Sequence, residues 1–195
     1  MIISDYGLFL AYVEEYDDAI RLARYATVLD PNNSALFANL GGVLQLAGDI
    51  DAAADALLQS TMLNPLDLGP LQNLARLEAG RGNEADAVRY LQTAEERFTV
   101  GGFIAHGYAL AGQRDKAIEF ATRQRDAGPG GASFEALQSL ILGEREKALE
   151  FLELLVDHQR PLNFGVMRLK YNVWPDPTLN EPEFVEVRQR IVFAE

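Results

Sequence analysis

Apolar residues recur at every third or fourth position over most of the chain, which is the spacing of one face of an α-helix. In residues 34–67 they form two stripes, one of Phe37, Leu40 and Leu44 and one of Leu57, Leu58 and Met62. Between the stripes stand Gly48, which can end a helix in the left-handed conformation, and Asp49, which can cap the next helix. Pro65 follows the second stripe and cannot continue a helix. The pattern therefore predicts a helix, a tight turn and a second helix.

This arrangement repeats along the chain. A six-residue phrase that ends in alanine recurs with spacings of 34, 34, 30 and 31 residues. The alanines are Ala19, Ala53, Ala87, Ala117 and Ala148. The ends of the units follow nearly the same period, at Pro31, Pro65, Thr99, Pro129 and Pro161. A regular period of this size indicates stacked helical units.

The first helix of each predicted unit also carries a small residue at one repeating position, where two helices must approach closely. These residues are Gly7, Gly41, Ala75, Ala105 and Ala136. With the turn phrase, the alanine of the second helix and the proline at the end of the unit, they make residues 1–160 resemble the tetratricopeptide-repeat family. The resemblance implies an all-α fold, a right-handed α-solenoid of about five helix-turn-helix units. The expected units are residues 1–33, 34–67, 68–97, 98–130 and 131–160.

Two units depart from the pattern. The third is four residues shorter than the first two (30 against 34), so its second helix near Glu95–Phe98 or the following loop is expected to be trimmed. In the fifth unit Glu135 and Ser139 stand at apolar positions. The buried face of that unit is therefore expected to consist of Leu137, Leu140 and Ile141.

Residues 161–195 lie outside the repeat and are predicted to form a cap over the last hairpin, because an open solenoid end exposes its core. Asn180 suits a helix N-cap and Pro182 suits the first turn. The inward face of this helix is predicted to carry Phe184, Val187, Ile191 and Val192. The stretch DPTLNEPEF also resembles the C-terminal repeat region of bacterial signalling proteins that carry an adenylate cyclase or winged-helix domain. That resemblance implies a larger bacterial regulatory protein.

The first predicted helix begins near Met1–Ile3 without a preceding cap residue or unit. Ile2, Ile3 and Leu10 would then lie on or near an exposed face. We expect either that the chain is part of a longer protein or that this end meets a partner, which includes a second copy of the chain.

Composition narrows the classes of partner. The chain has 17 basic and 29 acidic residues, a net charge of −12, so it would repel a nucleic-acid backbone and better suits a basic or neutral protein. No apolar run approaches the ~18 residues of a membrane helix, and no membrane span is expected. The lack of cysteine and of a secretory signal favours the cytoplasm.

No motif points to an enzyme. His106 and His158 lie 52 residues apart in different units, so we expect no metal site. The letters GRGNEA, residues 80–85, match a dinucleotide-binding pattern but join two predicted helices and follow no strand. Trp174 is expected to fill the C-terminal cap. No nucleophile and base are paired, no cofactor is expected, and an enzyme built from scattered carboxylates is the least favoured alternative.

The family resemblance implies that the first helices line a concave groove, which binds an extended peptide or a partner protein. The groove positions that are candidate binding residues are Asn39, Gln45, Gln72, Asn73, Arg76, Phe103 and His106. Amides can bond a peptide backbone, Arg76 can anchor a carboxylate, and Phe103 can fill a side-chain pocket. Two alternatives remain open: these residues are only solvated, or the chain self-associates through its N-terminal end.

Chaperone-binding members of the family clamp the C-terminal carboxylate of a peptide with Lys and Asn residues. In this sequence Ser4 stands where the first Lys is expected, and Gly69 and Asn73 hold the later basic positions. Asn39 is the only clear match. A chaperone adaptor is therefore not expected.

Overall fold

The computed structural model describes residues 2–97, 104–128, 132–156 and 177–191. Within these ranges the chain forms α-helices and a 3-10 helix and contains no β-strand, which confirms the predicted all-α fold. The chain divides into two compact units, Met1–Thr99 and Val100–Glu195.

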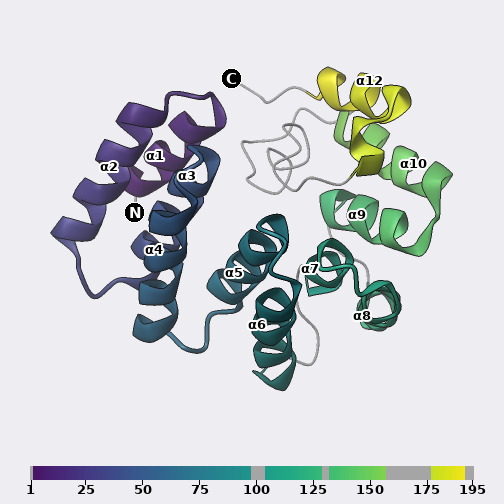
Figure 1. Ribbon diagram of the computed structural model, residues 1–195. Coiled ribbons are helices and arrows are strands. Elements are labelled where there is room, and N and C mark those ends of the chain that lie inside the picture. Colours follow the sequence, from purple (N-terminus) through teal and green to yellow (C-terminus); the bar gives the residue numbers. More distant parts are fainter. Residues whose placement is uncertain (1, 98–103, 129–131, 157–176, 192–195) are drawn as a thin grey trace. The chain divides into compact units, whose positions relative to one another are not determined.

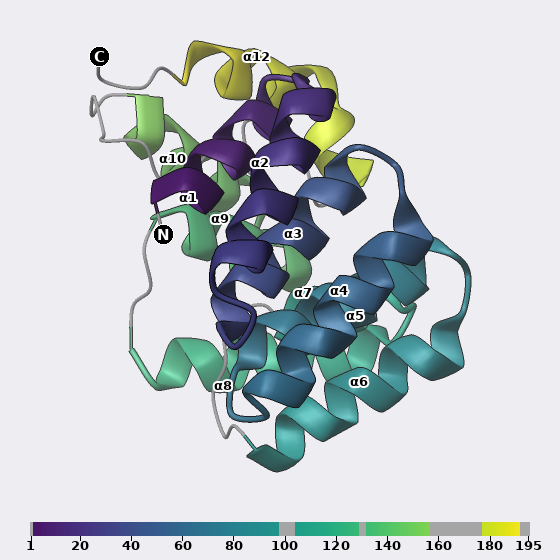
Figure 2. The same ribbon diagram turned by 90° about the vertical axis from the view of Figure 1, so that its left-hand side faces the viewer.

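The N-terminal unit is a series of helical hairpins (Figure 1). Its helices in residues 2–97 are α1 (Ile2–Tyr12), α2 (Tyr16–Leu29), α3 (Ser34–Leu46), α4 (Ile50–Leu63), α5 (Leu68–Gly80) and α6 (Glu84–Arg97). The two helices of each hairpin pack against each other, and α3 contacts both α1 and α5. Figure 2 shows the same hairpins from the side. The first helices of neighbouring hairpins therefore lie next to one another, as the repeat predicts.

Each turn within a hairpin is closed by the same backbone hydrogen bonds. In the second hairpin the Asp49 N–H donates to the Leu44 carbonyl at 2.9 Å and the Gly48 N–H to the Gln45 carbonyl at 3.1 Å, the Schellman pattern. Gly48 has a φ of 84°, which glycine adopts without a Cβ clash. The equivalent glycines, also at positive φ, are Gly82, Gly112 and Gly143. The first hairpin instead has Glu14 at this place, with a φ of 66°.

Side-chain caps begin several helices of the N-terminal unit. The Asn33 side chain accepts from the Ala35 N–H at 3.2 Å at the start of α3, and Asp49 accepts from the Ala52 N–H at 3.3 Å at the start of α4. At the start of α2, Glu15 holds the cap position and makes no side-chain cap hydrogen bond. The α1–α2 and α3–α4 hairpins therefore form with and without a side-chain cap on their second helix.

The repeated small residues are buried between the helices, as predicted. The alanines of the turn phrase, Ala19, Ala53, Ala87, Ala117 and Ala148, are at most 1% exposed. A Cβ at Gly41 would lie only 2.6 Å from the Leu57 Cγ, so α3 and α4 approach more closely there than an alanine allows. Gly7 has more room, because the nearest atom to a Cβ would be the Ala19 carbonyl oxygen at 3.2 Å.

The C-terminal unit ends in a helix that covers its last described hairpin. Its elements are α7 (Ile104–Leu110), α8 (Arg114–Asp126), α9 (Ala132–Leu142), α10 (Arg145–Val156), the 3-10 helix η1 (Pro177–Asn180) and α12 (Pro182–Arg190). Phe184, Val187 and Ile191 are buried in one apolar cluster with residues of α9, α10 and η1, so these three residues face inward, as the sequence pattern predicts. The Arg145 guanidinium also forms ion pairs with Glu181 and Glu183.

The start of this helix corrects a prediction. Glu181 holds the N-cap position of α12 and makes no side-chain cap hydrogen bond, whereas Asn180, the predicted cap, lies in η1. The intervening turn of 3-10 helix moves the start of α12 by one residue. The predicted inward residue Val192 lies outside the described residues, as do His158 and Trp174.

Two further predictions need correction or sharpening. Leu58 and Met62 are 40% and 69% exposed, so the prediction that they share a buried stripe with Leu57 is wrong. The buried face of α4 instead carries Ala53, Ala56, Leu57 and Ser60. Both α6 and α4 have 14 described residues, so the described part of α6 is not shortened. The loop predicted to follow α6 lies outside the described residues.

The phase of the fifth unit agrees with the sequence pattern. Leu137 is 2% exposed and Ile141 is 7% exposed, and Leu140 packs against the same cluster. Gln138 and Ser139 are buried as well. The apolar face predicted for this helix is therefore confirmed, and the buried face is wider than predicted.

Candidate partner-binding surface

The predicted polar strip begins where α3 meets α1. The Asn39 side-chain nitrogen donates to the Ser4 Oγ at 2.9 Å and to an Asp5 carboxylate oxygen at 3.3 Å. Ser4 is fully buried, and Asn39 is half-buried. These bonds fix the amide so that its nitrogen faces α1. Among the described residues nothing donates to the Asn39 Oδ1, which leaves that oxygen as an acceptor.

A second cluster connects α3 to α5. One terminal nitrogen of Arg76 donates to the Gln45 Oε1 at 2.6 Å and to the Asn73 Oδ1 at 3.1 Å. Arg76 is 7% exposed, and both amides are half-buried. Because a guanidinium can only donate hydrogen bonds, it selects the amide oxygens. The –NH₂ groups of Gln45 and Asn73 are therefore left as donors.

The remaining predicted residues are not part of these two clusters. Gln72 lies on α5, directly before Asn73, and is half-buried. His106 lies on α7 in the C-terminal unit and is 3% exposed. Phe103 lies outside the described residues. The structure therefore brings together Gln45, Asn73 and Arg76, with Asn39 in a neighbouring cluster on the same helix as Gln45.

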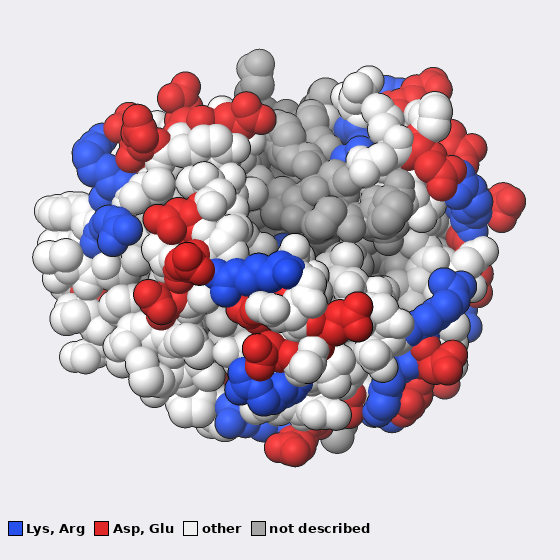
Figure 3. All heavy atoms as spheres, viewed as in Figure 1, with Lys and Arg blue, Asp and Glu red and all other residues white. Residues whose placement is uncertain are grey.

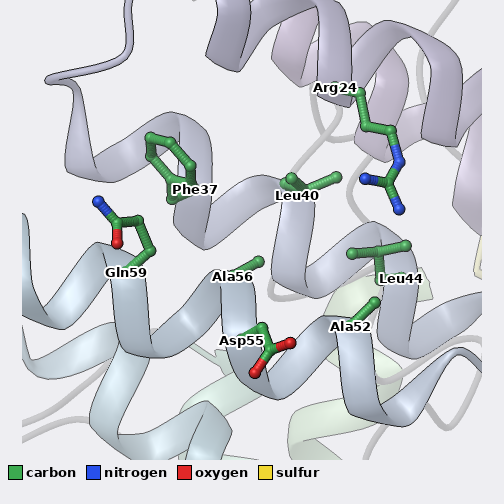
Figure 4. Close-up of a pocket in the computed structure, with 8 residues that line it drawn as sticks. All are labelled: Arg24, Phe37, Leu40, Leu44, Ala52, Asp55, Ala56 and Gln59. Carbon is green, nitrogen blue, oxygen red and sulfur yellow. The ribbon is translucent and has the colours of Figure 1, made fainter.

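A pocket of about 260 Å³ lies between α2, α3 and α4 (Figure 4). Its apolar residues include Phe37, Leu40 and Leu44 of α3. Arg24 of α2 and Asp55 of α4 line it from the two neighbouring helices. Both of these side chains are exposed, and within the described residues neither forms an ion pair or a side-chain hydrogen bond. The sequence pattern did not predict this pocket.

Solved structures with this architecture exist. TTC0263, a thermophilic TPR protein from Thermus thermophilus, superposes with a TM-score of 0.61 at 20% identity, over 88% of this chain and 96% of that chain. PilF from Pseudomonas aeruginosa gives 0.55 at 16% identity, over 96% and 80%. MamA gives 0.52 at 23% identity, over 74% and 89%. The chain has the tetratricopeptide-repeat fold.

The comparison with sequences adds nothing to this assignment: no protein-family model and no curated protein matches the chain. Within the tetratricopeptide-repeat fold, α1, α3 and α5 are the first helices of their repeats, and α2, α4 and α6 are the second helices. The two polar clusters thus lie on first helices. The pocket opens between the second helices α2 and α4.

The second helices also carry exposed apolar side chains at or just beyond their C-terminal halves. We call these residues the outer apolar patch: Tyr25, Val28, Leu29, Leu58, Met62 and Leu66. Figure 3 shows uncharged surface at the left, where α2 and α4 lie in Figure 1. One signal could have revealed this patch from the sequence: Val28 and Met62 are 34 residues apart and hold the same position in consecutive repeats.

Neither a metal site nor a membrane span is found among the described residues. They contain no group of three or more His, Asp or Glu side chains that could hold a metal ion. Among the helices of the described ranges, none is both long enough and apolar enough to cross a bilayer.

Proposed function

We propose that this chain is a protein–protein interaction module that binds an extended peptide segment of its partner along α1, α3 and α5. The tetratricopeptide-repeat fold supports the general role. The observation that carries the specific proposal is the fixed orientation of three amides: Asn39 presents an oxygen, and Gln45 and Asn73 present nitrogens.

An extended peptide offers alternating carbonyl oxygens and N–H groups, so it can bond both kinds of amide group. In this proposal Asn39 accepts from a peptide N–H, and Gln45 and Asn73 donate to peptide carbonyls. Arg76 acts as a positioning residue, because it holds the two amides in the donating orientation. Gln72, which precedes Asn73 on α5, extends the proposed site. Phe103, outside the described residues, and His106, in the C-terminal unit, stay predictions of the sequence.

Main-chain hydrogen bonds do not depend on the side chains of the peptide. The site is therefore proposed to accept many sequences with moderate affinity, with preference set by side-chain contacts that flank the amides. A basic or neutral peptide suits the acidic chain best, since the net charge is −12.

The test begins with selection of peptides from a random library on the full chain, followed by measurement of the dissociation constant by fluorescence anisotropy. The double variant Gln45→Ala/Asn73→Ala removes two donors, each worth about 0.5–1.5 kcal/mol, so binding should weaken about 5- to 150-fold. Gln92→Ala on the exposed face of α6 is the matched control and should bind normally.

Arg76→Met separates positioning from direct contact. It keeps the apolar bulk but frees both amides to rotate, so binding should weaken although the donors are still present. Circular dichroism checks that each variant is folded. If folded Gln45→Ala/Asn73→Ala binds the peptides as tightly as the unchanged chain, the three amides are not the binding site.

We also propose a regulatory setting. The resemblance of DPTLNEPEF to the ends of bacterial signalling proteins supports a role as the partner-sensing part of a larger cytoplasmic regulator. The sequence of the whole gene product tests this directly. A product without any catalytic or DNA-binding domain would remove the support for a regulator and leave a free-standing adaptor.

A further inference from the structure

The outer apolar patch contains six of the ten large apolar side chains that are exposed among the described residues. Val28 is 75% exposed, Met62 is 69% exposed and Leu66 is 78% exposed. Single exposed apolar residues are common on proteins, whereas contiguous groups mark interaction surfaces. Here they gather at the C-terminal ends of two consecutive second helices.

Among the described residues, the later second helices carry a single large exposed apolar side chain, Leu154 of α10, at 43%. The outer faces of α6 and α8 carry exposed charged residues, such as Arg89 paired with Asp86 and Arg123 paired with Glu119. The patch is therefore not a property of the repeat itself. It belongs to the first two hairpins.

The pocket between α2 and α4 adds charge to this surface. Its volume, about 260 Å³, is below that of pockets for drug-sized ligands and suits a single apolar side chain. Arg24 lines it from one helix and Asp55 from the other. Nearby charges are already paired, Arg21 with Asp18 and Asp51 with Arg81.

We propose that a second copy of this chain binds to the outer apolar patch through a two-fold axis. A two-fold axis places each residue of one copy against a different residue of the other, and the reverse pair forms at the same time. Arg24 of each copy then lies opposite Asp55 of the other, and the apolar ends of α2 and α4 cover each other. Because α2 carries the cation and the neighbouring α4 carries the anion, two copies related by this axis present opposite charges to each other.

This charge pattern favours a second copy over a partner of one charge sign. A purely basic or acidic partner would leave either Arg24 or Asp55 facing a like charge as the interface closes, which is unfavourable. The six side chains of the outer apolar patch carry no charge, so two chains of net charge −12 can meet there without direct contact between carboxylates.

The area of this surface limits how tightly two copies of the chain can bind. Each of α2 and α4 has 14 residues, so each is about 21 Å long, and two neighbouring helices are about 20 Å wide. The outer faces of the two helices together cover roughly 400–500 Å² on each copy, or about 800–1,000 Å² in total, which is below the ~1,200–2,000 Å² of standard-size interfaces. We expect a weak, concentration-dependent dimer.

Sedimentation equilibrium of the full chain over a broad range of concentrations tests the proposal. The average mass should rise above the monomer mass of 21.5 kDa as concentration increases. Val28→Asp/Met62→Asp should keep the chain monomeric, and since both side chains are exposed the fold should persist. Gln45→Ala/Asn73→Ala should dimerise normally, which separates this surface from the proposed peptide site.

A charge exchange tests the pairing itself. Arg24→Glu and Asp55→Arg should each weaken the dimer about tenfold, because like charges then face each other twice. The double variant Arg24→Glu/Asp55→Arg should restore it. Arg114→Glu on α8 is the charge-matched control and should have no effect. A chain that stays monomeric, a dimer that survives Val28→Asp/Met62→Asp, or a double variant that fails to recover would each overturn the proposal.

Discussion

The first two hairpins have the same architecture but reach it with different local chemistry. In the α3–α4 hairpin, Gly48 takes the left-handed turn position and Asp49 caps the following helix. In the α1–α2 hairpin, Glu14 takes the same conformation and Glu15 makes no side-chain cap. The turn hydrogen bonds are nevertheless equivalent, since the Glu15 N–H donates to the Leu10 carbonyl at 2.9 Å, as the Asp49 N–H does to Leu44.

This difference shows which part of the repeat phrase determines the fold. A non-glycine residue in the left-handed region costs about 1–2 kcal/mol, which is tolerated only if other interactions hold the turn in place. Ala19 is fully buried in the first hairpin, as Ala53 is in the second. Both hairpins therefore share the packing of their helices around the buried alanine. The residue in the turn changes only the stability of the hairpin.

The largest expected effect lies at the close approach of α3 and α4. Gly41→Ala should lower the free energy of unfolding by about 1–3 kcal/mol, because its Cβ would overlap the Leu57 Cγ and approach the Ala53 carbonyl. Gly7→Ala should change it by less than about 1 kcal/mol, since the closer contact offsets the helical preference of alanine. Urea denaturation of both variants checks the contrast. Equal losses would show that the two hairpins pack with the same spacing.

An intermediate effect is expected from exchange of the turn residues. Glu14→Gly should raise the free energy of unfolding by about 0.5–1 kcal/mol, because glycine removes the steric cost but loses more chain entropy on folding. Gly48→Glu should lower it by about 1–2 kcal/mol. The same denaturation measurement applies. A loss of stability in Glu14→Gly would mean that the glutamate side chain makes a favourable contact that outweighs its backbone strain.

The smallest effect concerns the caps. Asp49→Ala should cost about 1 kcal/mol, because the Ala52 N–H loses its acceptor. Glu15→Asp should gain about 0.5 kcal/mol, since the shorter side chain can accept from an N–H in the first turn of α2. Thermal unfolding followed by circular dichroism detects both shifts. If neither variant moves the midpoint, solvent satisfies these N–H groups as well as a side chain does.

Sequence periodicity predicted the hairpins and their contact residues well, because both depend on local rules. The burial of Ala19 and Ala53 and the place of the Gly48 turn follow from one repeated phrase. Periodicity failed at Leu58 and Met62, since an apolar residue next to a helical stripe can face either the core or a neighbouring molecule. The N-cap of α12 was placed one residue early because a turn of 3-10 helix before it has no strong sequence signal.

The candidate site shows a different limit. The sequence placed Asn39, Gln45, Asn73 and Arg76 on first helices, and the structure has them there. The orientation of each amide depends on partners from another repeat, 31 residues away for Gln45 and Arg76. Such pairings arise only from tertiary packing, so the donor and acceptor pattern was beyond sequence reasoning.

The three-residue turns also have a kinetic consequence. Because only residues 13–15 and 47–49 separate the antiparallel helices of the first two hairpins, many contacts join residues that are close in sequence, and such low-contact-order chains fold quickly. In a repeat array, folding can start in one hairpin and spread to its neighbours. The α3–α4 hairpin has both the unstrained turn and the cap, so we expect the folding nucleus to form there and the α1–α2 hairpin to join it later.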